Sequence, residues 1–340
     1  MKEISKEMIK HCGGLPLAIE VLSGLLRNCA SHEWRRIYES INSNMAGGFE
    51  DVFHVLNLSF EELPAYLKHC FLYLASFPED YEISVETLSY YWAAEGIPRP
   101  RYYDGASIRE VADAYIEELV KRNMVISKRD VDTSRFETCQ LHDMMREVCL
   151  RKSEEENFVE TIETSTANSE SPCKSRRLAV VGLRKETFNV DTEVKNPSLR
   201  TLLLINCRGW KVSSLLFASH KLMRVLDLTW VEFEGGKVPS SIGKLIHLRY
   251  LNLAWSEVTQ LPSSMRNLKK LLYLNLFVNV FVEVYMPNIL KEMRELTFLC
   301  LPDSLHEKTM LELGNLVKLE TLKNFSTKHG RVTDLQGMSL

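Results

Sequence analysis

The triplet Leu141-His142-Asp143 brings together an imidazole and a carboxylate, the two groups from which a general-base dyad is built. Such a dyad acts on a serine or cysteine nucleophile, and no motif in the sequence places one beside it. An aspartate at the start of a helix more often caps free backbone amides, and we expect Asp143 to do so. The triplet therefore predicts a helix cap and a hydrogen-bonding histidine, and the chain is not expected to be an enzyme.

The cysteines near this triplet raise the question of a metal site. Cys139 stands three residues before His142, and Cys149 follows seven residues after it. A zinc site needs a second ligand pair at comparable spacing, which is missing, so no metal is predicted. The chain has eight cysteines and no Cys-x-x-Cys motif. They are expected to be buried free thiols of a reducing cytosol, and the predicted location is cytoplasmic.

Glycine-rich loops that cradle nucleotide phosphates are the third kind of chemistry to look for. The sequence contains two Gly-Lys pairs, Gly236-Lys237 and Gly243-Lys244, followed by Val238 and Leu245. A phosphate-binding loop of the form G-x-x-x-x-G-K-[ST] needs a hydroxyl at that next position to hold magnesium. Neither pair fits, so tight binding of ADP by this chain alone is not expected.

A repeat dominates the second half of the chain. Copies of Leu-x-x-Leu-x-Leu or close variants begin at positions 175, 199, 223, 248, 271, 296 and 319. This period of 23–25 residues is typical of leucine-rich repeats. Alternating leucines turn one face of a short strand inward, and successive strands stack into a continuous core. The next repeat would begin near position 343, so we expect about seven repeats, truncated at the C-terminus.

The first half of the chain is predicted to be helical with one small β-ribbon. Gly13-Gly14 ends a first helix and Pro16 begins a second one. Ser107 and Glu110 have the spacing of a capping box at the start of a helix that runs to about Arg122. Two strand-like segments, 124–128 and 135–139, follow this helix. Helices followed by a two-stranded ribbon predict a winged-helix arrangement.

These patterns give an α+β multidomain fold: a helical subdomain, a winged-helix domain and an α/β leucine-rich-repeat solenoid. The expected boundaries are 1–48 for the helical subdomain, 49–152 for the winged helix, 153–174 for a linker and 175–340 for the repeats. The linker is predicted because 153–174 is rich in Glu, Ser and Thr and poor in apolar residues.

Charge is distributed unevenly along the chain. Residues 1–174 contain 19 Lys and Arg against 30 Asp and Glu (−11), and residues 175–340 contain 23 against 15 (+8). The two halves are complementary, which favours an intramolecular contact between them over binding to nucleic acid. The sequence contains no run of about 18 uncharged apolar residues and no N-terminal signal peptide, so no transmembrane segment is predicted.

Several ordered motifs resemble a known family. They are Gly14-Leu15-Pro16-Leu17-Ala18, the run 67–80 that reads LKHCFLYLASFPED, Trp92-Ala93-Ala94-Glu95-Gly96 and Leu141-His142-Asp143, followed by the repeats. In this order they resemble the plant intracellular nucleotide-binding leucine-rich-repeat disease-resistance proteins, of which Trp92 indicates the coiled-coil subclass. The resemblance covers the C-terminal portion of such proteins, without the coiled coil and the phosphate-loop core.

The resemblance implies a function in plant innate immunity. Pro16 corresponds to the proline that packs against the adenine of ADP, and His142 to the histidine that contacts its β-phosphate and latches the resting state. The cofactor is then ADP, exchanged for ATP on activation, and the partner of residues 175–340 is a pathogen effector or a guarded host protein. Leu141 stands where the family usually has methionine, a change of similar volume that should leave the latch intact.

Two other functions stay open on the sequence. A truncated scaffold could keep the protein-binding repeats and lack nucleotide switching, and the missing phosphate loop supports it. A winged helix could instead bind DNA, but the helix 107–122 has Arg109, Lys121 and Arg122 against four acidic residues, a net charge of −1. DNA binding is therefore the less favoured alternative.

Overall fold

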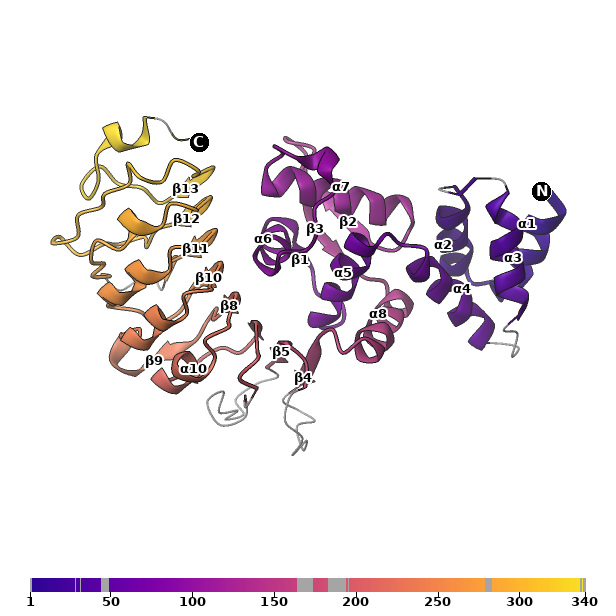
Figure 1. Cartoon of the computed structure of the whole chain (residues 1–340), viewed down its shortest axis with the longest axis horizontal. Coiled ribbons are helices and arrows are strands. Elements are labelled where there is room, and N and C mark those ends of the chain that lie inside the picture. The colour runs from indigo at the N-terminus through magenta and orange to yellow at the C-terminus, as the bar shows by residue number, and fades with distance from the viewer. Residues whose placement is uncertain are drawn as a thin grey trace. The chain divides into compact units, whose positions relative to one another are not determined.

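The structure is a computed structural model that describes residues 2–27, 29–30, 32–43, 49–163, 174–182, 194, 196–278, 283–336 and 338. The chain divides into two compact units (Figure 1). The first unit comprises Met1–Trp92 and Ile97–Glu156, and the second comprises Ala93–Gly96 and Asn157–Leu340. The division after Glu156 falls inside the segment predicted as a linker.

The N-terminal part of the first unit is helical. Its helices are α1 (Lys2–Lys10), α2 (Pro16–Arg27), α3 (Glu33–Ser43) and α4 (Phe49–Glu61). Gly13 and Gly14 separate the first two helices with φ angles of 57° and 73°, a left-handed conformation that glycine adopts without strain. Apolar residues at helical spacing, such as Val21 and Leu25 of α2, are fully buried.

The remainder of the first unit is a winged helix, as predicted. Its helices are α5 (Ala65–Tyr73), α6 (Val85–Glu95), α7 (Ile108–Lys121) and α8 (Asp143–Glu155), and its strands are β1 (Ile83–Ser84), β2 (Ile126–Arg129) and β3 (Phe136–Gln140). The strands form an antiparallel sheet in the order β1-β3-β2. The sequence indicated two strands, and the third, β1, has only two residues and therefore leaves no alternating pattern to detect.

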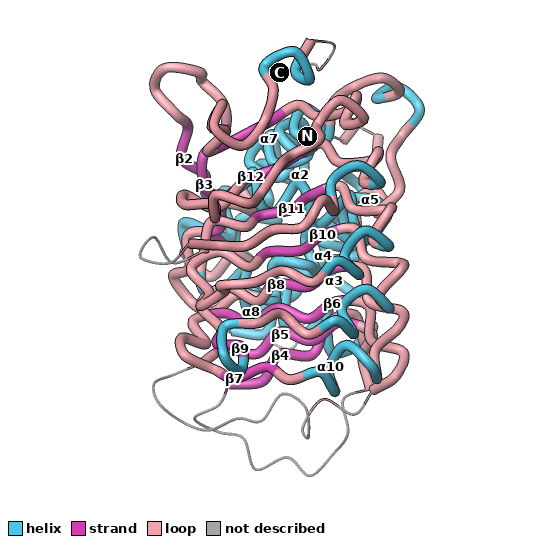
Figure 2. The backbone as a smooth tube through the Cα atoms, turned by 90° about the vertical axis from the view of Figure 1, so that its left-hand side faces the viewer, coloured by secondary structure: helices cyan, strands magenta, loops and turns pink. Residues whose placement is uncertain are grey.

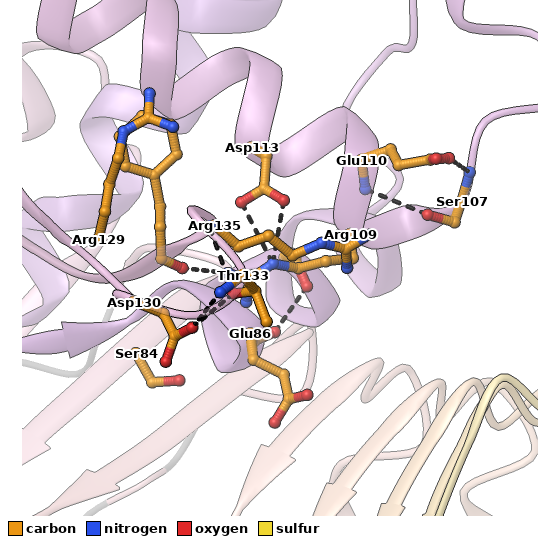
Figure 3. Close-up of polar contacts among 12 residues, drawn as sticks. Ser84, Glu86, Ser107, Arg109, Glu110, Asp113, Arg129, Asp130, Thr133 and Arg135 are labelled. Carbon is orange, nitrogen blue, oxygen red and sulfur yellow. Dashed lines mark hydrogen bonds and ion pairs between the residues drawn. The ribbon is translucent and has the colours of Figure 1, made fainter. Parts of the chain in front are cut away.

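Local hydrogen bonds fix the ends of these elements (Figure 3). Ser107 accepts a hydrogen bond from the Glu110 backbone N–H, and the Glu110 carboxylate accepts one from the Ser107 N–H, which confirms the capping box at the start of α7. Between β2 and β3, Asp130 Oδ1 accepts hydrogen bonds from the backbone N–H and hydroxyl of Thr133, both at 2.7 Å. Asp130 thereby closes the turn of the wing.

The second unit contains an eight-stranded parallel sheet in the order β13-β12-β11-β10-β8-β6-β5-β4. Its strands are β4 (Glu160–Glu163), β5 (Arg177–Val181), β6 (Thr201–Ile205), β8 (Val225–Asp227), β10 (Tyr250–Asn252), β11 (Tyr273–Asn275), β12 (Phe298–Cys300) and β13 (Thr321–Lys323). Figure 2 shows the strands of this sheet stacked as successive rungs. Seven of them, β5 to β13, fall in the seven copies of the repeat, and the leucine-rich-repeat fold is confirmed.

The register of this sheet aligns the leucines of successive repeats. Leu202 pairs with Leu226, which pairs with Leu251, and the row continues through Leu274 and Leu299. All five are fully buried, and they belong to one continuous hydrophobic core. Stacking therefore gives each leucine apolar neighbours above and below, and no single repeat could bury its leucines alone.

Short helices and a second small sheet complete the coils. They include α10 (Ser214–Ser219) and the 3₁₀ turns Ser240–Lys244, Ser263–Asn267 and Leu290–Glu292. Strands β7 (Lys211–Val212) and β9 (Glu232–Phe233) pair in parallel outside the main sheet. None of the helices in the described ranges is both long and apolar enough to cross a membrane.

The linker predicted at 153–174 needs a correction. Helix α8 extends to Glu155, and Glu160–Glu163 forms β4, which pairs in parallel with β5. The acidic composition that indicated a linker is compatible with an edge strand, because charged residues there face solvent and block further pairing. Of the predicted linker, 164–173 lies outside the described residues.

Candidate functional site

His142 caps helix α8. Its backbone is extended (φ −70°, ψ 146°), and its ring nitrogen Nδ1 accepts a hydrogen bond from the Met144 backbone N–H at 3.4 Å. The prediction that Asp143 provides the cap is therefore wrong. Asp143 is the first residue of the helix, where its negative charge still complements the positive end of the helix dipole.

This cap determines which hydrogen-bonding group His142 has available. A neutral imidazole whose Nδ1 is an acceptor carries its hydrogen on Nε2. The side chain is exposed, so the Nε2–H donor can reach a ligand oxygen. A single, well-oriented donor is the chemistry that the structure gives to His142.

Pro16 is the first residue of α2. Its ring is exposed, and a proline at this position lacks only an N–H that the helix would leave unpaired. The glycine pair before it forms the turn that leads into α2. An added Cβ at Gly13 would lie 3.0 Å from the Val52 side chain, so a larger residue would fit poorly there. Pro16 thus offers a flat apolar surface that could pack against a base.

The structure does not bring Pro16 and His142 into direct contact. Each lies at the start of its own helix, and helix α4 packs against both α2 and α8. The helices that carry the two side chains therefore belong to one helical scaffold within the first unit.

These residues alone do not make a nucleotide site. The hollow beside Leu141, lined by Phe77, Asp80, Tyr81 and Arg146 among others, has space for about one water molecule. Pro16 and His142 supply an apolar surface and one donor, whereas phosphates need a cradle of backbone amides and a lysine. The residues present fit the edge of an ADP site and not a complete one.

The two cysteines nearest to His142 are buried thiols. Burial raises the pKa of the Cys139 thiol to about 12 and that of the Cys149 thiol well above its usual value. Both are protonated at neutral pH, and a thiol must ionise to attack or to bind zinc. No group of three or more metal-ligating side chains occurs in the part of the chain that the structure describes.

The basic residues of α7 are not available to DNA. Arg109 pairs with Asp113, Lys121 with Glu117 and Arg122 with Glu118, each at 3.0–3.2 Å along the same helix. Figure 3 shows the Arg109 and Asp113 pair. Because a carboxylate on the same helix pairs with each cation, this helix presents no positive face to phosphates.

Glu95, for which the sequence indicates no separate role, is a buried carboxylate. Ala93–Gly96 belongs to the second unit, and the Glu95 side chain is only 1% exposed. It accepts hydrogen bonds from Arg177, at 2.9 Å, and from the Thr201 hydroxyl. Arg224 donates to its backbone carbonyl at 2.8 Å. The Trp92–Gly96 motif marked this residue, but only the three-dimensional structure supplies its partners.

A row of arginines runs along the same sheet. Arg176, Arg200, Arg224 and Arg249 occupy the same position on four successive strands, because the amide of each of the last three donates to the carbonyl of the one before. Burial and the like charges of Arg224 and Arg176 lower the pKa of Arg200. These four arginines therefore form a row of positive charges, and one of them, Arg224, contacts Glu95.

The geometry defines the class: a winged-helix protein with a leucine-rich-repeat solenoid. Comparison with known families agrees. Residues 77–149 match the disease resistance protein winged helix domain, and residues 198–339 match a leucine-rich repeat region.

Known proteins resemble the chain along its full length. It is 60% identical to the probable disease resistance protein At1g59620 of Arabidopsis thaliana, over 100% of this chain and 39% of that protein. It is 57% identical to RF45 (99% and 34%) and 49% identical to RPP8 (100% and 38%), both disease resistance proteins of the same plant. The chain is therefore homologous to a part of these disease resistance proteins, and it spans under two fifths of their length.

Proposed function

We propose that this chain is a receptor module of plant innate immunity whose repeats recognise a pathogen effector or a guarded host protein in the cytoplasm. The observation that carries the proposal is the winged helix of disease resistance proteins followed, in one chain, by a leucine-rich-repeat solenoid. Solenoids of this kind leave one face of every strand for partners, which supports recognition of a protein by the repeats.

The winged helix would supply the resting-state latch. In this proposal the Nε2–H of His142 donates to the β-phosphate of ADP, and Pro16 packs against the adenine. The phosphate cradle would come from a loop that this sequence does not contain. His142 supports the proposal because its Nδ1 is engaged by the helix cap, which fixes the ring and leaves the Nε2–H available.

A plant assay tests the proposal. The 340 residues would replace the matching segment of At1g59620, and the fusion would be expressed in leaves with and without His142→Asn. If His142 holds a resting state, the variant fusion triggers a defence response, such as local cell death, without a pathogen, whereas the unmodified fusion stays silent.

Equal silence of the two fusions, with equal protein levels, would contradict the latch and favour a protein-binding scaffold. A fusion in which the repeats 175–340 are exchanged for those of RPP8 provides the control for recognition. It should keep the latch and change only the pathogen to which the plant responds.

A further inference from the structure

Two consecutive repeats carry the same sequence, Trp-x-Glu, at the same position. Trp230-Val231-Glu232 follows β8, and Trp255-Ser256-Glu257 follows β10. The two indole rings stack at 5.2 Å between centroids and 9° between planes. Glu232 and Glu257 pair with each other in a parallel bridge. The residues between them, Val231 and Ser256, are fully buried, whereas both tryptophans and both glutamates are at least partly exposed, so both indoles and both carboxylates face away from the core.

The backbone at both tryptophans is unusual. Trp230 has a φ of 66° and Trp255 a φ of 59°, in the left-handed region. Asn206, at the corresponding position of the preceding repeat, has a φ of 57°. Asparagine adopts this conformation readily, whereas for bulky residues it is uncommon. The position thus favours asparagine for folding, and two tryptophans there indicate a role beyond folding.

This surface is open and negatively charged. Trp255 is 40% exposed and Glu257 is exposed, whereas Trp230 and Glu232 are half-buried. Among the described residues, neither of the two carboxylates has a hydrogen-bonding or ion-pair partner. Two adjacent, unpaired carboxylates repel one another, and a cation between them would remove that repulsion.

The structure shows how a guanidinium contacts this aromatic row. Arg208, from the preceding repeat, lies over the Trp230 ring with 4.7 Å between its guanidinium carbon and the ring centroid. At the other end, Phe277 meets Trp255 edge-on at 4.8 Å. The row therefore runs from the Arg208 guanidinium through the two indoles to the Phe277 ring. Its exposed part is the indole of Trp255, which is 40% exposed.

We propose that Trp230, Trp255, Glu232 and Glu257 form a docking surface for an arginine-bearing segment of a partner protein. The aliphatic stem of the arginine would pack against the indole edges, and its guanidinium would form paired hydrogen bonds with the two carboxylates. Aromatic and charged residues of this kind dominate the binding energy of protein interfaces. The inference rests on the proposed function, since it names the partner chemistry that the repeats select.

Calorimetric titration of a capped hexaarginine peptide into the purified 340-residue chain, at 150 mM salt, tests the surface. The decisive variants are Trp255→Asn and the double variant Glu232→Gln/Glu257→Gln. Each should weaken binding by about tenfold or more, which is the range of an interface hot spot. Trp255→Asn should also melt at the same or a higher temperature, because asparagine suits the backbone there better.

The matched controls are Tyr285→Asn, which removes an exposed aromatic side chain elsewhere on the repeats, and Glu307→Gln/Glu312→Gln, which removes two exposed charges. Both should bind hexaarginine within about twofold of the unmodified chain. A Trp255→Asn variant that melts at a lower temperature would show a structural role for the indole, and the Glu232→Gln/Glu257→Gln variant then decides alone.

Binding within twofold of the unmodified chain in that double variant would overturn the proposal. So would hexalysine binding as tightly as hexaarginine, since charge alone would then explain it. The titration involves neither nucleotide nor a plant response, so its failure would leave the immune function to be judged by the leaf assay.

Discussion

At the scale of single residues, His142 has a structural role as a helix cap, and we propose a binding role for the same ring. Its Nδ1 caps α8, and its Nε2–H is directed to solvent. We predict that His142→Ala lowers the free energy of unfolding by about 0.5–2 kcal/mol, the usual cost of losing a helix cap. His142→Asn should keep nearly full stability, because asparagine is a good cap. Chemical denaturation of both variants measures this, and equal losses in the two would contradict the capping role.

The ion pair between Arg36 and Glu62 predicts how acid affects the first unit. Two hydrogen bonds of 2.8 Å join the two side chains, and the bond from Arg36 lowers the pKa of Glu62 below its usual 4.5. A lowered folded-state pKa stabilises the fold above the unfolded value, and this stability is lost as the pH falls through the folded one.

Unfolding free energy should therefore decrease below about pH 4.5, with up to about 1 kcal/mol of that decrease due to this partly exposed pair. Glu62→Gln should remove that part of the pH dependence, as should Arg36→Met. Denaturation curves between pH 3 and 7 provide the measurement. A Glu62→Gln chain with an unchanged pH profile would show that the pair contributes nothing.

Residues in local motifs were predictable, and residues with distant partners were not. Pro16 at a helix start follows from the glycines before it, and the Ser107 capping box from four consecutive positions. Asp143 was expected to be the cap because carboxylates are common at that position. In the structure Asp143 is already the first residue of α8, and the imidazole of His142 is the cap. The burial of Glu95 depends on Arg177 and Thr201, which are far away in sequence. Nothing in the sequence around Glu95 indicates these partners.

At the scale of elements, close packing between helices sets strict limits. Gly24 of α2 lies against the end of α7, where an added Cβ would come within 2.5 Å of the Arg122 carbonyl oxygen. Gly24→Ala should destabilise the fold by about 1–3 kcal/mol through overpacking, although alanine is the better helix former.

Ser23→Ala, on the exposed side of the same turn of α2, is the matched control and should be neutral or slightly stabilising. Thermal denaturation of the two variants separates packing from helix propensity. Similar melting temperatures for both would show that α7 can move away from α2 at little cost.

Elements were predictable where periodicity and end signals coincided. The repeat strands follow from leucine spacing alone, and α7 follows from its capping box. Helix α3 was not anticipated because it buries only Ile37 and Ile41 as a narrow apolar stripe. The polar composition of 153–174 predicted a linker, whereas Glu160–Glu163 forms β4, a half-buried strand at the end of the sheet where polar residues are tolerated. Tertiary pairing with β5, and not local composition, makes them a strand.

At the scale of the whole molecule, residues 1–174 have a net charge of −11 and residues 175–340 one of +8. The intramolecular contact that this complementarity favours stays a prediction. Basic residues at the start of the repeats include Arg176, Arg177 and Arg184, of which Arg184 lies outside the described residues.

If that contact exists, reversing the exposed Lys174 and Arg176 to glutamate, which leaves the Arg177–Glu95 ion pair intact, should speed the hydrogen exchange of backbone amides in both halves of the full chain. A Lys269→Glu/Lys291→Glu variant, which changes net charge equally on exposed side chains, should not do so. Equal exchange rates in the two variants would contradict a specific contact made by the reversed basic residues.

The proposal that His142 latches a nucleotide-bound resting state can be tested by measuring ADP affinity. Calorimetry would compare the At1g59620 fusion with its His142→Ala and His142→Asn variants. Losing one hydrogen bond to a phosphate costs about 1.5–3 kcal/mol, so both variants should bind ADP about 10- to 150-fold more weakly. If His142→Asn, which keeps the cap, binds ADP as tightly as the unmodified fusion, the imidazole only caps α8, and the latch is wrong.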